Sequence, residues 1–201
     1  QPHADSISPS DRPAAIDAKE SSTEKQAPAV GVVCRTFRVR PQDEVWVVST
    51  RRLGCASDGP LPTLQFWRYA NAWWQPAAAD EFFGNYPTDK ITSFYIHGNQ
   101  IDHPQAYSDG LSVYFQLPGK LDSEPPVRFV IWSWPSSKIK GPLVDVRSKA
   151  VRSDSEARYL ARFLQQLPPS ANVGLIGYSF GARIVSGAVH RIGSESPTSS
   201  T

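Results

Sequence analysis

The chain has 201 residues, of which 40% are apolar and six are Trp, so it is long enough for one folded domain and a tail. Its formal net charge is +2 and its basic residues form no extended cluster, which argues against nucleic acid as a dedicated partner. No apolar run approaches the ~20 residues of a membrane span, so we predict no transmembrane segment. The sequence contains no Met, and its translation start is therefore expected upstream of Gln1. The compartment stays open, with an exported or cell-envelope location favoured.

The composition of the two ends differs from that of the middle. Residues 1–29 contain no aromatic residue and cannot bury enough apolar surface to offset their ordering entropy. We therefore predict a disordered tail over 1–29, a folded domain over 30–193 and a second disordered tail over 194–201. Cys34 and Cys55 either form a disulfide across a loop, if the protein is exported, or remain thiols, if it is cytosolic. The scattered Cys and His residues have no zinc-binding spacing, so we expect no metal and no other cofactor.

Two β-rich segments begin the folded region. Residues 43–50 predict a strand, and the alternating residues 64–69 predict its antiparallel partner after a loop rich in Gly and Pro. We expect the nearby arginines to form a solvated face: Arg35, Arg38, Arg40, Arg51 and Arg52. Several aromatic residues follow, and their density invites a carbohydrate- or lipid-binding interpretation. We favour the simpler role of packing the first hairpin onto the sheet for Trp73, Trp74, Phe82 and Phe83.

Three later segments predict strands, at residues 91–96, 127–133 and 172–177, and two of them contain a continuous apolar run, at 129–132 and 173–176. Such runs are typical of strands that are covered on both faces, so we predict a central sheet in which the three are mutually parallel. Helices are predicted near 103–117 and 145–167, with another after the last strand. Asp102 is expected to cap the first of them. Ser153 and Glu156 have capping-box spacing, which leaves the start of the second helix open.

The pattern G-x-S-x-G occurs at residues 177–181, between the last predicted strand and the last predicted helix. On such a turn the pattern is a nucleophile elbow, which lifts the serine hydroxyl clear of the sheet edge. The glycines at 174, 177 and 181 do not have the spacing of a dinucleotide-binding turn, and no phosphate-binding P-loop pattern is present. A glycine-rich turn with a purely structural role is the remaining alternative.

A second motif, H-G-N at residues 97–99, follows the predicted strand 91–96. With this motif and the elbow, the order of elements over roughly 90–190 resembles the α/β-hydrolase superfamily, in which an H-G-x loop supplies half of the oxyanion hole. The S-W-P-S stretch at 133–136 is similar to uncharacterised lipase-like branches of that superfamily. The resemblance implies a three-layer α/β sandwich with a central, mostly parallel sheet. It also implies a serine hydrolase that cleaves a carboxylic ester or a related acyl bond of a small molecule.

The resemblance assigns roles to particular residues. Ser179 is the nucleophile, and the backbone N–H of Phe180, at a helix N-terminus, is the first oxyanion donor. The N–H of Asn99 is the second donor, and His97 positions the loop. Ligands of open α/β sheets bind at the carboxyl ends of the strands, which makes two aromatic residues candidates for the pocket wall: Trp134 and Tyr178.

The catalytic acid and base stay unknown. In the superfamily both follow the serine along the chain. Residues 180–201 are too few for further strand-and-helix units of about 30 residues each, so we expect an amino-terminal part of the domain without its carboxyl-terminal strands. His103 is the loose candidate for a base. Two alternatives remain: a catalytically inactive module that binds a ligand or partner, and an envelope-associated aromatic binding module. The oligomeric state stays open.

Overall fold

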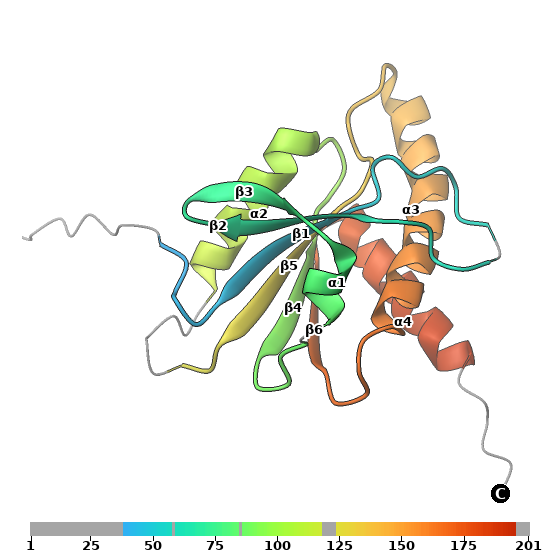
Figure 1. Ribbon diagram of the computed structural model, residues 1–201. Coiled ribbons are helices and arrows are strands. Elements are labelled where there is room, and N and C mark those ends of the chain that lie inside the picture. The colour runs from blue at the N-terminus through green and yellow to red at the C-terminus, as the bar shows by residue number, and fades with distance from the viewer. Residues whose placement is uncertain (1–37, 58, 85, 118–123, 196–201) are drawn as a thin grey trace, which may run out of the picture. The chain divides into compact units, whose positions relative to one another are not determined.

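A computed structural model describes residues 38–57, 59–84, 86–117 and 124–195 of the protein. The described residues form an α/β fold with a six-stranded sheet in the order β3-β2-β1-β5-β4-β6 (Figure 1). The strands are β1 (Glu44–Ser49), β2 (Gln65–Ala70), β3 (Trp73–Ala77), β4 (Ile91–Ile96), β5 (Val127–Ser133) and β6 (Asn172–Gly177). The helices are α1 (Ala79–Phe83), α2 (His103–Gln116), α3 (Pro142–Leu164) and α4 (Phe180–Glu195).

Four strands of the sheet are parallel. β5 pairs with both β1 and β4, and β4 pairs with β6, each in parallel register. The prediction that the strands near 91–96, 127–133 and 172–177 are mutually parallel is therefore confirmed. The reason is visible in β5, where six consecutive residues are buried, because helices cover both of its faces.

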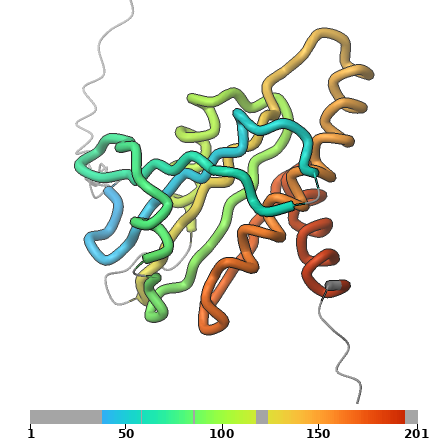
Figure 2. The backbone as a smooth tube through the Cα atoms, turned by 45° about the vertical axis from the view of Figure 1, so that its right-hand side comes forward, coloured from blue at the N-terminus to red at the C-terminus, as the bar shows by residue number. Residues whose placement is uncertain are grey.

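Alternate residues of the strands contribute to two separate cores. Trp46, Phe94 and Val130 belong to the core beneath α3 and α4, together with Phe163 and Ile184 of those helices. On the opposite face, neighbouring strand residues pack against α2 in a second core, formed by Val45, Val47, Phe129, Ile131, Ala106, Tyr107 and Tyr114. The described residues thus form three layers, with α2 on one face of the sheet and α3 and α4 on the other (Figure 2). None of the described helices is both long and apolar enough to cross a bilayer.

The amino-terminal part of the sheet is antiparallel, as predicted, and has one strand more than expected. β2 pairs antiparallel with β1, and β3 pairs antiparallel with β2 after a tight turn at Asn71 and Ala72, both with positive φ. β3 contains Pro76, which an edge strand tolerates. Phe82 is fully buried, as expected for packing of the hairpin, but Trp73 is 75% exposed, so the packing role was wrong for that ring.

Helix boundaries confirm one predicted cap and correct another. Asp102 caps α2, since its side chain accepts the N–H of Gln105 at 2.9 Å. α3 begins at Pro142, and both Ser153 and Glu156 lie buried in its interior, so the capping box proposed for that pair was wrong.

The predicted domain limits of 30–193 stay a prediction. α4 extends to Glu195, two residues into the tail predicted over 194–201. The tail predicted over 1–29 lies outside the described residues, as does Cys34. A disulfide between Cys34 and Cys55 therefore stays a prediction, and Cys55 itself is exposed.

Candidate active site

The nucleophile candidate Ser179 lies on a sharp turn between β6 and α4. β6 ends at Gly177 and α4 begins at Phe180. Ser179 has a φ of 53°, in the left-handed region, where a residue with a side chain costs of order 1–3 kcal/mol. The residue is exposed at the tip of the turn. A strained, exposed serine between a strand and a helix has the local geometry that a nucleophile elbow requires.

The H-G-N loop lies directly against this turn. Ile96 and Gly177 are register partners, so β4 and β6 end at the same level. The N–H of Tyr178 donates to the carbonyl of Ile96 at 3.0 Å. A Cβ on Gly98 would lie 3.0 Å from the Tyr178 ring and 3.3 Å from Ser179 Cβ, which is tighter than an ordinary contact, so the glycine favours the close approach of the two loops. The loop and the elbow therefore share one edge of the sheet, as the sequence led us to expect.

The two residues assigned to the oxyanion hole flank this contact. Phe180 is the first residue of α4, and its N–H is one of the terminal amides that have no intrahelical acceptor. The Asn99 side chain donates from Nδ2 to Oδ2 of Asp145 at 2.6 Å, and Asp145 also accepts the N–H of Ile139 at 3.1 Å. Asp145 is 1% exposed and belongs to α3. The loop that carries Asn99 is thus tied to the neighbouring helix.

Electrostatics keep Asp145 available for this contact. Burial by itself raises the pKa of its carboxyl group, but hydrogen bonds from Ile139, Asn99 and Gln100 and the charge of Lys149 lower the pKa below its ordinary value overall. Asp145 is therefore ionised at neutral pH and remains an acceptor for the Asn99 amide. In the sequence, position 145 indicated only the start of a helix. Its role in holding the H-G-N loop depends on the contact with Asn99, which is distant along the chain.

His97 holds the loops together and is not free to act as a base. It is 1% exposed, and its Nε2 accepts the backbone N–H of Trp134 at 3.3 Å. Nδ1 therefore carries the proton and donates to the carbonyl of Gly98 at 3.0 Å. Burial lowers the pKa of His97 to about 4; the bond to Gly98 opposes this shift and the positive charge of Arg51 adds to it.

This lowered pKa predicts a loss of stability in mild acid. The imidazole is neutral in both states above its ordinary pKa of 6.5, so its full contribution is present there. As the pH falls below 6.5, the unfolded chain takes up the proton first, and the loss continues until the pH reaches about 4. From pH 7 to pH 5 we expect His97 to reduce the free energy of unfolding by about 2 kcal/mol.

Urea unfolding of the wild type and of His97→Gln at both pH values measures this effect. Gln does not titrate, so the variant should be less stable throughout but should lose about 2 kcal/mol less than the wild type between the two pH values. The pKa of His103 is also lowered, by burial and by the charges of Arg51 and Arg52, and this contribution is common to both proteins. Equal losses in the two proteins would contradict the prediction.

The two pocket-wall candidates differ in their exposure. Trp134 is fully buried, and its indole Nε1–H donates to the carbonyl of His97 at 2.8 Å. Its ring also stacks on that of His97, with centroids 5.8 Å apart and planes 14° from parallel. Trp134 therefore packs inside the protein against His97 of the H-G-N loop and does not face an open pocket. Tyr178 is 66% exposed and lies beside Gly98 and Ser179.

Arg51 is a structural part of this edge that sequence analysis missed. Its guanidinium group donates to Ser133 Oγ at 2.7 Å and to the carbonyls of Ile101 and Asp102 at 3.0 and 3.1 Å. Arg51 thus joins the loop after β1 to the end of β5 and to the residues just before α2, so the prediction that it belongs to a solvated face was wrong. In the sequence, the one indication of this role was that Arg51 directly follows a predicted strand, where loops meet.

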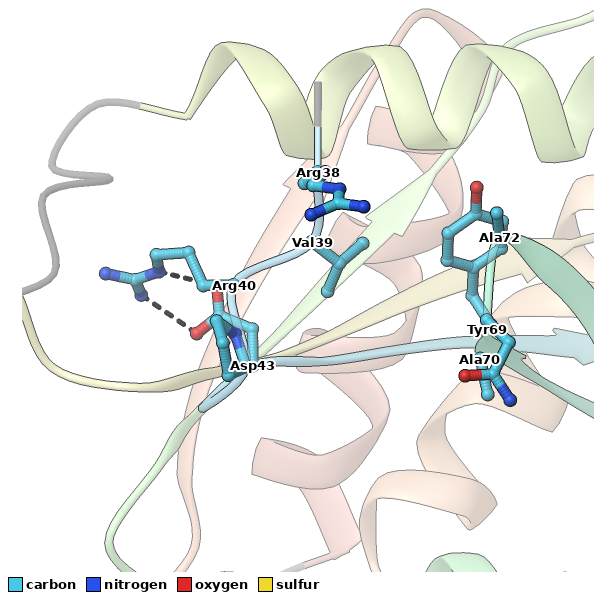
Figure 3. Close-up of a pocket in the computed structure, with 9 residues that line it drawn as sticks. Arg38, Val39, Arg40, Asp43, Tyr69, Ala70 and Ala72 are labelled. Atoms are coloured by element: carbon cyan, nitrogen blue, oxygen red, sulfur yellow. Dashed lines mark hydrogen bonds and ion pairs between the residues drawn. The ribbon is translucent and has the colours of Figure 1, made fainter. Parts of the chain in front are cut away.

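The same correction applies to Arg40. It is buried and forms a bidentate ion pair with Asp43, with Nε and Nη2 each 2.8 Å from a carboxylate oxygen (Figure 3). Both residues line a hollow of about 880 Å³, whose wall also includes Tyr69 and Ala72. A second hollow of about 470 Å³ lies between the β2–β3 hairpin and α2. Neither hollow is lined by Ser179, Asn99 or Phe180.

No base is in place at Ser179 within the described part of the chain. No hydrogen bond there joins the Ser179 hydroxyl group to a histidine or a carboxylate. The ring of His103 packs against Trp67 and Tyr107, with centroids 5.9 and 4.7 Å apart, and His190 is exposed on α4. Among the described residues, moreover, no group of His, Cys, Asp or Glu side chains is arranged to hold a metal ion.

Comparisons with protein-family models, with curated proteins and with solved structures found no match to this chain. The α/β class, the parallel strands and the contact between the H-G-N loop and the elbow follow from the structure itself. The function of the loops at the carboxyl ends of β4 and β6 therefore depends on the chemistry of their residues.

Proposed function

We propose that this chain carries the nucleophile and the oxyanion loop of a serine hydrolase of the α/β-hydrolase type, which cleaves carboxylic esters or related acyl bonds. The observation that supports this proposal best is the position of Ser179. Its backbone is strained at a strand-to-helix turn, and that turn packs directly on Gly98 of a second loop. A purely structural turn would not require a side chain in the left-handed region, because glycine fits there without strain.

The proposed reaction uses both loops. Ser179 Oγ attacks the carbonyl carbon, and its proton passes to a base as the tetrahedral oxyanion forms. The backbone N–H groups of Phe180 and Asn99 donate to that oxyanion, which requires distances of about 2.7–3.1 Å. Collapse of the intermediate expels the alcohol, which takes the proton from the base, and water then hydrolyses the acyl-serine. Esters and related acyl compounds are the substrate class because both undergo this addition and elimination.

The described residues place no base at Ser179, which determines how the proposal is tested. Without a base, Ser179 should react slowly with a fluorophosphonate probe, and p-nitrophenyl acetate should turn over at close to the buffer rate, unchanged in His103→Ala. Added imidazole should supply the base and accelerate labelling at Ser179, identified by mass spectrometry. Ser179→Ala should abolish the labelling, whereas Ser186→Ala, which changes an exposed serine on the following helix α4, should retain it. Labelling at another serine, or none in the folded protein, would refute the proposal.

A second function is favoured by the same absence of a base in the described residues. An elbow without a base can bind an acyl compound without turning it over, which makes the chain a catalytically inactive hydrolase-like module. The imidazole experiment separates the two functions. An inactive module should leave Ser179 unlabelled even with imidazole present.

A further inference from the structure

The amino-terminal half of α3 has its polar face toward the protein. A helix on the surface of a globular domain normally turns apolar side chains inward and polar ones toward water. On α3 the inward positions of this half carry four buried polar side chains: Asp145, Lys149, Ser153 and Glu156. Their partners are the Asn99 amide, the Pro135 carbonyl and the Thr50 hydroxyl group, among others, which explains why polar residues are needed there.

The outward side of the same half is apolar. Leu143 is 73% exposed and Val144 is 61% exposed, and Val151, two turns further on, is 65% exposed. Val146 and the preceding Ile139 are 50% and 38% exposed. We call these five residues the α3 apolar patch. Adjacent exposed side chains of this size on one helix mark a contact surface, whereas single ones do not.

Three exposed cations surround the α3 apolar patch, and one exposed carboxylate lies beside it, Asp154, one turn after Val151 and paired with Arg183 at 3.1 Å. Lys138, Lys140 and Arg147 are exposed, and Arg147 lies one turn from both Leu143 and Val151. The one acidic residue between positions 137 and 151 is Asp145, which is buried and turned toward Asn99. An apolar surface with three exposed cations, whose one neighbouring carboxylate is already paired, complements an anionic, amphipathic surface.

The patch is located at the edge of the sheet that carries Ser179. Asp145 binds Asn99 of the H-G-N loop, and Lys149 donates to the carbonyl of Pro135 at 3.2 Å, in the loop after β5. α3 therefore runs past the loops at the carboxyl ends of the strands, and its first turns lie beyond those loops (Figure 1). A surface that touches the patch also lies near the elbow.

We propose that the α3 apolar patch docks the protein onto an anionic lipid bilayer. Leu143, Val144 and Val151 would enter the boundary between headgroups and acyl chains, and Lys138, Lys140 and Arg147 would contact the anionic headgroups. A bilayer fits better than a protein groove because three exposed cations lie beside the patch, whereas its one neighbouring exposed carboxylate, Asp154, is paired with Arg183. The docking does not depend on catalysis, and the Ser179→Ala variant should bind as the wild type does.

Flotation of the full chain with vesicles tests this proposal. We expect binding to vesicles that contain phosphatidylserine, weak binding to phosphatidylcholine alone, and release by added salt. The double variant Leu143→Ser and Val144→Ser should weaken binding about tenfold or more. Val189→Ser, which changes an equally apolar and 52% exposed residue on α4, should not. Arg147→Gln should weaken binding about fivefold, and Arg191→Gln, on α4, should leave it within about twofold.

Circular dichroism melts of the same variants check that they fold, which is expected because the changed side chains are exposed. The pair Lys138→Gln and Lys140→Gln precedes the helix and gives a second test that leaves α3 intact. Equal binding to both kinds of vesicle, or binding unaffected by these substitutions, would overturn the proposal. Self-association in the ultracentrifuge that the Leu143 and Val144 changes abolish, without vesicle binding, would also overturn it and identify a second copy as the partner.

Discussion

Gly181→Ala is expected to destabilise the domain by about 3 kcal/mol or more. A Cβ at this position would lie 2.0 Å from the carbonyl oxygen of Ile96 and 2.8 Å from that of His97. Both are backbone atoms at the end of β4, so neither can move aside as a side chain would. Relief requires that α4 shift away from the H-G-N loop, which also separates Ser179 from Gly98. Urea unfolding measures the loss of stability, and imidazole-assisted labelling of Ser179 should fall with it.

Gly193→Ala is the matched control on the same helix. A Cβ there meets nothing within 4 Å, and alanine is the better helix former, so this variant should be unchanged or stabilised by up to about 1 kcal/mol. If Gly181→Ala unfolds at the same urea concentration as the wild type, the close approach of α4 to β4 does not exist in solution. The contact between the elbow and the H-G-N loop would then lose its support.

Glu156→Ala is expected to cost about 3–5 kcal/mol. Glu156 is fully buried, and its Oε2 accepts the Thr50 hydroxyl group at 2.7 Å and the Trp132 indole N–H at 3.3 Å. Its Oε1 lies 2.7 Å from Nη2 of Arg152, whose side chain is 13% exposed. Removal of the carboxylate leaves that guanidinium group poorly solvated and unpaired, and it leaves the Thr50 and Trp132 donors unsatisfied. Chemical denaturation at neutral pH measures the cost.

Two further variants show which property of Glu156 matters. Burial raises its pKa, while Arg152 and the hydrogen bonds oppose that rise, so the neutral, isosteric Glu156→Gln should cost less than the alanine variant. Asp154→Ala removes an exposed acid on the same helix, paired with Arg183 at 3.1 Å, and should change stability by no more than about 0.5 kcal/mol. Equal, small effects of Glu156→Ala and Asp154→Ala would show that the buried network is not formed.

The parallel part of the sheet and the elbow could be predicted because their signals are local. β5 is covered by helices on both faces and contains the continuous apolar run 129–132, which differs from the alternation in β2. The G-x-S-x-G turn needs glycine at fixed positions, since a Cβ on Gly177 would meet Ala182 Cα at 2.5 Å. Asp102 directly precedes α2, so its role as the N-cap could also be predicted from the sequence. Each of these features depends on neighbours within a few residues.

Buried polar residues could not be predicted, because their partners lie far away along the chain. Arg51, Asp145 and Glu156 look like surface residues in the sequence, but Asp145 and Glu156 are buried, Arg51 is half-buried, and each bonds to residues far away along the chain. The inverted polarity of α3 has the same cause. A periodic pattern reports which positions are apolar, whereas the packing of loops decides which side of a helix faces inward. The sequence alone thus determined the parallel strands and the position of Ser179. The tertiary structure decided how the loops around Ser179 are held and which side of α3 stays exposed.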